Sequence, residues 1–147
     1  MAKIKIETIE IKQIREYANN PRKIKKAIEP VMRSIKKFGY TNPIIINGDN
    51  VILAGHTRLE ALRKTGAINA EVIRLTHLTE EQEKAFRIAD NRTSEFSEWD
   101  MDLLEKEMRE INADDWKSFG FDNKIIERVA APNMCTCPKC GKQFMKI

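Results

Sequence analysis

This 147-residue chain lacks any long apolar run. None of its hydrophobic stretches approaches the roughly 20 residues that a membrane-spanning helix requires. Residues 1–14 alternate polar and apolar side chains and lack the continuous apolar segment of a secretory signal peptide. Internal repeats and low-complexity tracts are also missing, and hydrophobic residues make up 41% of the chain. We therefore expect a cytoplasmic, globular protein with no membrane partner.

Cysteine is scarce, and its three occurrences, Cys135, Cys137 and Cys140, all fall near the C-terminus. This clustering excludes a disulfide framework. The sequence Cys-Pro-Lys-Cys-Gly at residues 137–141 is typical of half a zinc ribbon, with Cys135 as a third thiolate ligand of Zn²⁺. No fourth ligand follows in the sequence, and a four-thiolate site with two cysteines from each of two chains would give a zinc-linked homodimer. An unmetallated tail or a reactive thiol pair is the alternative.

Charge is distributed unevenly around a net value of +4. Residues 1–40 hold eleven Lys and Arg against four Asp and Glu, whereas residues 79–115 hold five against thirteen. A basic segment favours a polyanion such as DNA. The simpler interpretation is that most of these charges lie on solvated helix faces.

Hydrophobic periodicity and turn residues predict an α/β or α+β fold, in which a small mixed sheet has flanking helices. We expect a strand within 4–11 with a bulge or bend near Glu7–Thr8, a helix from near Glu29 to Gly39, and strands at 43–47, 51–54 and 70–75. Helices are expected at 57–66, 79–92 and 100–111, followed by a turn and a last short helix within 114–129. The domain boundaries predicted from this order are 1–95, 96–130 (C-terminal helices) and 131–147 (Cys-rich tail).

Some of these helices carry more detailed expectations. Thr79 and Gln82 form a capping-box pattern, and Asp100 is a typical N-cap residue. The apolar spacing of the helix after Asp100 predicts four inward side chains, Leu103, Leu104, Met108 and Ile111. Four aromatic residues, Trp99, Trp116, Phe119 and Phe121, are expected to pack the C-terminal helices.

The turn Gly55-His56-Thr57-Arg58 joins a predicted strand to a predicted helix. Unpaired N–H groups at a helix start attract anions, and glycine permits a close approach to the backbone. An arginine fork suits phosphate, and a histidine donates a hydrogen bond or acts as acid or base near neutral pH. The turn therefore favours a phosphate site. In the alternative, Thr57 only caps the helix, Arg58 pairs with an acid and His56 is an ordinary surface residue.

Five segments occur together in one order: NPRK at 20–23, SIKKFGYTNPIII at 34–46, ILAGHTRLEALRKTG at 52–66, AEVIRL at 70–75 and ADNR at 89–92. This ordered set resembles the ParB N-terminal domain, or ParB-like nuclease domain, of the ParB/sulfiredoxin superfamily. The continuation beyond ADNR is similar to the type found in phage and plasmid proteins, often next to DNA methyltransferases. The resemblance implies a bacterium or a phage-infected host.

The resemblance implies a site for a nucleoside triphosphate, CTP or ATP, with Mg²⁺. Its predicted nucleotide-binding residues are Asn20, Arg22, Thr41, Asn42, Gly55, His56, Thr57, Arg58, Asn91 and Arg92. Asp90 and Asn91 are the implied Mg²⁺ ligands, and His56 and Asp90 are the candidate catalytic residues. The family has a glutamate where this chain has His56 and an arginine where it has Thr57. The reactive cysteine of sulfiredoxins is missing from this turn.

Two kinds of function follow. In the first, the chain binds a nucleoside triphosphate and hydrolyses phosphoesters, either of the nucleotide or of nucleic acid, as a nucleoside triphosphatase or nuclease. No cluster of acids on adjoining strands, as a two-metal nuclease uses, is visible in the sequence. In the alternative, the chain is a non-catalytic DNA-binding or adaptor module, whose partner is a DNA methyltransferase or a phage packaging protein.

Overall fold

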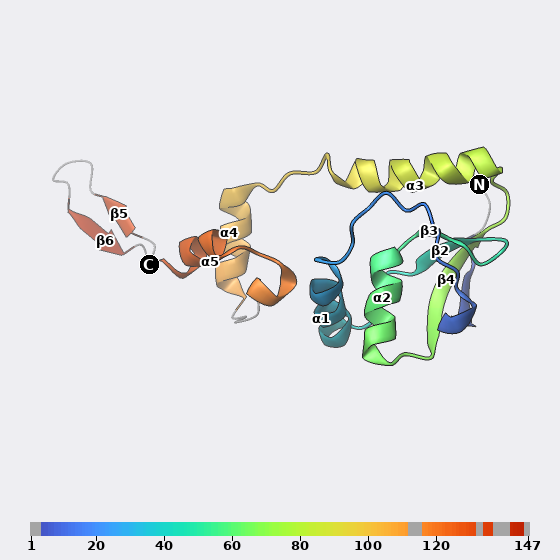
Figure 1. The fold of residues 1–147 in the computed structure, drawn as a ribbon. Helices are drawn as coiled ribbons and strands as arrows, with labels where there is room; N and C mark the ends of the chain where they lie inside the picture. The colour runs from blue at the N-terminus through green and yellow to red at the C-terminus, as the bar shows by residue number, and fades with distance from the viewer. Residues whose placement is uncertain (1–3, 112–115, 132–133, 137–141, 146–147) are drawn as a thin grey trace. The chain divides into compact units, whose positions relative to one another are not determined.

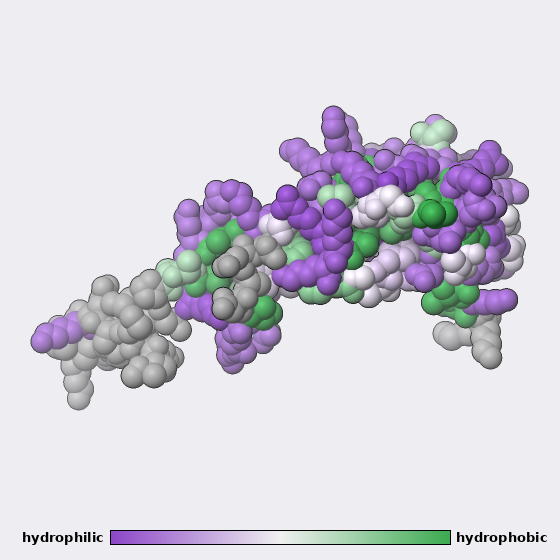
Figure 2. Space-filling model, turned by 90° about the horizontal axis from the view of Figure 1, so that it is seen from below, coloured by the Kyte–Doolittle hydropathy of each residue, from purple (hydrophilic) through white to green (hydrophobic). Residues whose placement is uncertain are grey.

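A computed structural model of the chain describes residues 4–111, 116–131, 134–136 and 142–145. The chain forms two compact units, Met1–Glu98 and Trp99–Ile147. No helix among the described residues is long and apolar enough to cross a membrane. On the face drawn in Figure 2, hydrophilic side chains cover most of the surface of the first unit, and hydrophobic residues form small separate patches.

The first unit contains a mixed sheet of four strands in the order β1-β4-β2-β3. The strands are β1 (Ile6–Glu10), β2 (Ile44–Asn47), β3 (Ile52–Ala54) and β4 (Asn69–Leu75). Strand β4 runs antiparallel to β1 and parallel to β2, and β2 and β3 form an antiparallel pair. The small mixed sheet predicted from the sequence is confirmed.

Three α-helices and a short 3₁₀ helix complete this unit: η1 (Ile11–Gln13), α1 (Ile28–Phe38), α2 (His56–Thr65) and α3 (Glu80–Ser94). In Figure 1, α1 and α2 lie side by side, and α3 runs past the β2–β3 part of the sheet. The Thr79–Gln82 capping box that starts α3 is present in both directions, with distances of 3.3 and 2.9 Å.

Side chains along the central strands alternate between the hydrophobic core on one face of the sheet and a cavity on the other. Ile44 and Ile46 of β2 and Val72 of β4 are fully buried, and they pack with Leu59 of α2 in the hydrophobic core. Successive side chains of a strand point to opposite faces of the sheet. Ile45 and its β4 neighbour in register, Ile73, line a cavity instead.

Two expectations for the first unit are wrong. The pairing of β1 with β4 is continuous from Ile6 to Glu10, and the sheet irregularity lies between Ile45 and Ile46. The bulge or bend expected near Glu7–Thr8 is absent because the chain turns only after β1, where Ile11 enters η1 and reaches the core. Helix α2 begins one residue earlier than expected, so its N-cap is Gly55 rather than Thr57.

The second unit holds α4 (Met101–Glu110), η2 (Trp116–Phe119), α5 (Asn123–Ala130) and the antiparallel hairpin of β5 (Met134–Thr136) and β6 (Gln143–Met145). Asp100 caps α4 as expected, accepting a hydrogen bond from Leu103 N at 3.0 Å.

Packing within this unit agrees only in part with the apolar spacing. The rings of Trp99 and Trp116 both contact Phe121, with centroids 6.2 and 5.8 Å apart. Of the expected inward residues, Met108 is buried, whereas Leu103 and Ile111 are exposed. The prediction for these two is wrong because a single narrow face of α4 is covered within the unit.

Candidate functional site

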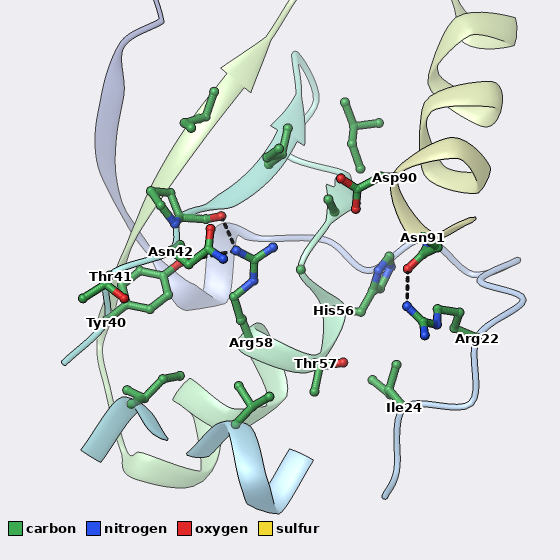
Figure 3. Close-up of a pocket in the computed structure, with 18 of the residues that line it drawn as sticks. Arg22, Ile24, Tyr40, Thr41, Asn42, His56, Thr57, Arg58, Asp90 and Asn91 are labelled. Atoms are coloured by element: carbon green, nitrogen blue, oxygen red, sulfur yellow. Dashed lines mark hydrogen bonds between the residues drawn. The ribbon is translucent and has the colours of Figure 1, made fainter. Parts of the chain in front are cut away.

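A cavity of about 640 Å³ opens at the start of α2. Its walls come from the loop before α1, from α1, from the loop between α1 and β2, from the β3–α2 turn and from the last turns of α3. Figure 3 shows Arg58, Tyr40 and Asn42 at one end, and Arg22 beside Asn91 at the other. All the predicted nucleotide-binding residues except Arg92 line it: Asn20, Arg22, Thr41, Asn42, Gly55, His56, Thr57, Arg58 and Asn91.

Gly55 sets the geometry of the turn. It adopts the left-handed conformation with φ of 108° and serves as the N-cap of α2. A Cβ added there would lie 3.1 Å from the Arg58 guanidinium and 3.2 Å from Ile44 Cγ1. The first backbone hydrogen bond of the helix runs from Leu59 N to Gly55 O, 3.0 Å. The N–H groups that precede Leu59 therefore lie outside the helical ladder, where a helix attracts anions.

Arg58 serves a purpose that its sequence context did not indicate. Its Nη1 donates to the backbone carbonyls of Asn42 and Pro43, at 2.8 and 2.9 Å. Burial lowers the pKa of Arg58, while Tyr40 and Asp90 oppose that effect. The guanidinium stays charged, but one of its nitrogens is already engaged in holding the α1–β2 loop against α2. Among the described residues, Arg58 donates its hydrogen bonds to backbone carbonyls and not to a carboxylate, so the alternative in which it pairs with an acid is wrong.

Tyr40 holds the same loop from its other side. The Tyr40 hydroxyl accepts from Ile44 N and donates to Glu71 O, both at 2.9 Å. Burial raises the pKa of this phenol, so the hydroxyl keeps its proton at neutral pH. Thr41 and Asn42 are thereby presented on a loop fastened at both ends. A tyrosine between a helix-ending glycine and a strand is a weak sequence pattern, and Tyr40 was not among the predicted site residues.

His56 is half-buried, and its Nε2 accepts a long hydrogen bond of 3.4 Å from Tyr17 N. Burial lowers the pKa of His56 below its ordinary value; Glu16 counteracts this and Arg87 adds to it. At neutral pH the imidazole is therefore uncharged. It offers one N–H donor to a ligand, because the other ring nitrogen is an acceptor. His56 suits the role of a neutral hydrogen-bond donor better than that of a general acid.

The opposite end of the cavity is closed by polar contacts between the 20–22 loop and α3. Arg22 Nη1 donates to Asn91 Oδ1 at 2.8 Å, and Arg22 N donates to Asn20 Oδ1 at 3.1 Å. The Asn91 amide in turn donates to Arg87 O at 2.7 Å. The Arg22–Asn91 contact joins residues 69 positions apart in the sequence. The hydrogen bonds of Arg22 bring together Asn20, Arg22 and Asn91, three of the predicted nucleotide-binding residues.

Asp90 is the only carboxylate among the described residues that line the cavity. Burial lowers the pKa of Arg58, and Asp90 is close enough to Arg58 to oppose that effect in part. Within the described ranges no group of three or more His, Cys, Asp or Glu side chains is placed to hold a metal. A Mg²⁺ ion here would therefore take most of its ligands from phosphate oxygens and water, as this ion commonly does.

Two sets of predicted residues lie elsewhere. Arg92 is outside the lining of the cavity, where it pairs with Glu95 at 2.8 Å and stacks on Phe96 at 4.6 Å. For the expected zinc ligands, Cys135 belongs to strand β5, whereas Cys137 and Cys140 lie outside the described residues.

The cavity also contains a residue that the sequence analysis missed. Arg87 of α3 is buried, and its guanidinium stacks on the ring of Tyr17, 4.0 Å from the centroid. Glu83, one helical turn earlier, pairs with it at 3.1 Å. The spacing of Glu83 and Arg87 on one helix face was visible in the sequence, but such i,i+4 pairs are usually solvent-exposed.

Fold and cavity together define a small α/β domain with a polar cavity at a helix N-terminus. The model of the ParB N-terminal domain matches residues 1–92, and the chain belongs to this family. One relative, the ParB-like nuclease domain-containing protein YnaK of Escherichia coli (strain K12), is 35% identical over 83 residues, covering 56% of this chain and 95% of YnaK.

Solved structures confirm the fold. The C-terminally truncated chromosome-partitioning protein ParB of Caulobacter crescentus, complexed with CTP-γ-S, superimposes with a TM-score of 0.61 at 16% identity, covering 85% of this chain and 70% of that chain. A Pnob8-like ParB-N domain gives a TM-score of 0.52 at 15% identity, covering 97% and 57%. The predicted ParB-like fold is thereby confirmed for the described residues.

Proposed function

We propose that this chain binds a nucleoside triphosphate in the cavity at the start of α2. The observation that carries the proposal is the composition of that cavity. It combines the unpaired N–H groups of a helix start with the side chains of Arg22, Arg58 and Arg87 and a single carboxylate, Asp90. Such a surplus of positive charge favours a polyanionic ligand. A volume of about 640 Å³ is ample for a nucleotide.

The CTP-γ-S bound by the Caulobacter crescentus relative supports a nucleotide as the ligand class. We further propose that Asp90, with Asn91 beside it, contributes to a Mg²⁺ site that the triphosphate completes. The Thr41–Asn42 loop, fastened by Arg58 and Tyr40, would contact the base. Hydrolysis of a phosphoester, with His56 and Asp90 as the catalytic residues, is a property separate from nucleotide binding. We propose binding first, because the described residues lack a multi-ligand metal cluster for nuclease chemistry.

Calorimetric titration of the full chain with CTP, ATP, GTP and UTP, each with and without Mg²⁺, tests this proposal. We expect one nucleotide to bind preferentially, with weaker binding when Mg²⁺ is removed or when Asp90 is replaced by Asn. A matched control is Asp49→Asn, since Asp49 is in the β2–β3 turn and does not line the cavity. Absence of binding by all four nucleotides would refute the proposal.

DNA is the second proposed ligand, favoured by the exposed basic segment next to the cavity. Lys23, Lys25 and Lys26 are exposed and follow Arg22 directly in sequence. A role of the phage and plasmid type, beside a methyltransferase or packaging partner, fits such a surface. We expect DNA affinity to fall steeply with salt and to weaken when all three lysines are replaced by Gln. Fluorescence anisotropy with a labelled duplex measures both, and salt-insensitive binding would contradict the assignment.

We also propose that Cys135, Cys137 and Cys140 bind Zn²⁺ and that a second copy of the chain completes the site. The support comes from the Cys-Pro-Lys-Cys-Gly pattern, preceded by strand β5 and followed by its partner β6. Metal analysis of the purified chain should give zinc, and Cys137→Ser should release it. Loss of zinc should also convert a dimer to a monomer in light scattering. Protein that is purified in the presence of zinc but carries none would rule the site out.

A further inference from the structure

Arg87 differs from the other cations of the cavity in how it is held. Its side chain is only 7% exposed, although it lines the cavity. Nε donates to Ile52 O at 3.0 Å, Nη2 donates to Glu83 Oε2 at 3.1 Å, and one face of the guanidinium covers the Tyr17 ring. The third nitrogen, Nη1, has no hydrogen-bond partner among the residues that the structure describes.

The two remaining arginines are less suited to fix an anion. Arg58 has committed its Nη1 to two backbone carbonyls. Arg22 is on an exposed loop, where Asn91 and, at 4.0 Å, Glu95 compete for its guanidinium. Arg87 is already desolvated and locked in place, so binding a ligand through it costs little side-chain entropy.

The charged groups around Arg87 are arranged so that an anion can bind to it on the side of the cavity. Glu83 balances the charge of Arg87, and Asn47 Nδ2 of β2 also donates to both Glu83 oxygens at 3.0 Å. On the side of the cavity, Arg87 is close enough to His56 to lower the pKa of the imidazole. A phosphate beside His56 would be adjacent to Arg87 and to the start of α2 at once. Asp90, the one described acid of the cavity lining, is the group that would oppose it.

We propose that Arg87 binds a phosphate of the ligand through Nη1, and that the polyphosphate occupies the end of the cavity bounded by His56, Asn91 and Arg22. This inference rests on the proposed nucleotide-binding function and assigns its anion contact to a residue outside the Gly55–Arg58 turn. Arg58 is, on this assignment, a positioning residue for the base-contacting loop.

The test compares two neutralised pairs in the full chain. Glu83→Gln with Arg87→Gln removes the proposed phosphate contact without leaving an unpaired buried charge. The matched control is Glu7→Gln with Arg74→Gln. Arg74 is also held by a carboxylate at 3.1 Å and by backbone carbonyls, but it does not line the cavity. Circular dichroism and thermal melting confirm that each variant is folded at the temperature of the titration.

Titrations with CTP, CMP and inorganic triphosphate provide the readout. In the Glu83/Arg87 variant, affinity for CTP and triphosphate should fall about tenfold or more, since a charge-assisted hydrogen bond is lost. CMP affinity should fall less, and the Glu7/Arg74 variant should bind all three ligands like the unmodified chain. A single Arg87→Lys variant should recover part of the lost triphosphate affinity.

Three results would overturn the inference alone: unchanged triphosphate affinity in the folded Glu83/Arg87 variant, equal losses for CMP and CTP, or no recovery with lysine. Equal losses would mean that Arg87 only supports the shape of the cavity. Failure of the unmodified chain to bind any nucleotide or inorganic triphosphate would instead overturn the proposed function, and this inference with it.

Discussion

At the scale of single residues, Gly55 shows how a correct prediction can rest on an incomplete reason. From the sequence, Gly55 was expected to let an anion approach the backbone at the start of a helix. In the structure Gly55 also has a backbone conformation that other residues rarely adopt, and it lies directly under the Arg58 guanidinium. The residue types of the site were therefore visible in the sequence. The hydrogen bonds from Arg58 to the Asn42 and Pro43 carbonyls were not visible in the sequence, because they form only when the loop of residues 40–43 lies against α2.

Replacing Gly55 by Ala should lower the free energy of unfolding by about 1–3 kcal/mol, the usual cost of an unfavourable φ. It should also weaken nucleotide binding, because the new Cβ displaces Arg58 from the Asn42 and Pro43 carbonyls. Urea denaturation and calorimetry measure the two effects. Gly48→Ala is the control, since nothing lies within 4 Å of its added Cβ. Equal stability of the two variants would contradict this account.

His56 makes the stability depend on pH. Because burial lowers its pKa in the folded chain, the unfolded chain binds a proton more readily. Stability is therefore unaffected by this group well above its ordinary pKa of about 6.5 and falls as pH drops below it, until the folded-state pKa is reached. Urea denaturation over this range should show a smaller loss for His56→Gln than for the unmodified chain. His77→Gln, at an exposed loop position, should keep the original loss.

At the scale of elements, local patterns specified where helices and strands begin, but not how they are attached. The capping box of α3 and the N-cap of α4 were readable because capping uses neighbouring residues. The attachment of α3 to β3 depends on Glu83 and Arg87, which look like a surface pair in the sequence. Only the tertiary structure shows that Arg87 is buried and that Glu83 is largely covered. Leu103 of α4 and its C-cap residue Ile111 illustrate the opposite error, because the sequence pattern predicted them to be inward and they are exposed.

Helix α3 contains one largely buried ion pair and one exposed ion pair, so the effect of burial on their contribution to stability can be tested within one helix. Glu83 forms an i,i+4 pair with the buried Arg87 and is itself largely covered, whereas Glu80 and Lys84 form an exposed pair at 2.7 Å. Glu83→Gln should lower the free energy of unfolding by roughly 3 kcal/mol, because it leaves a buried guanidinium without its counter-charge. Glu80→Gln should leave stability unchanged within error. Thermal and urea unfolding of both variants check the prediction, which fails if the two changes are equivalent.

At the scale of the whole molecule, every residue that lines the cavity belongs to the unit Met1–Glu98. The core of that unit is also self-contained, from Ile11 to Val72. A chain ended after Glu98 should therefore fold cooperatively and bind the preferred nucleotide with an affinity within about twofold of the full chain, since distant independent regions contribute nearly additively. Calorimetry on both chains measures this. A large loss of affinity in a folded short chain would mean that residues 99–147 contribute to the site, and the cavity described for the first unit would then be only part of it.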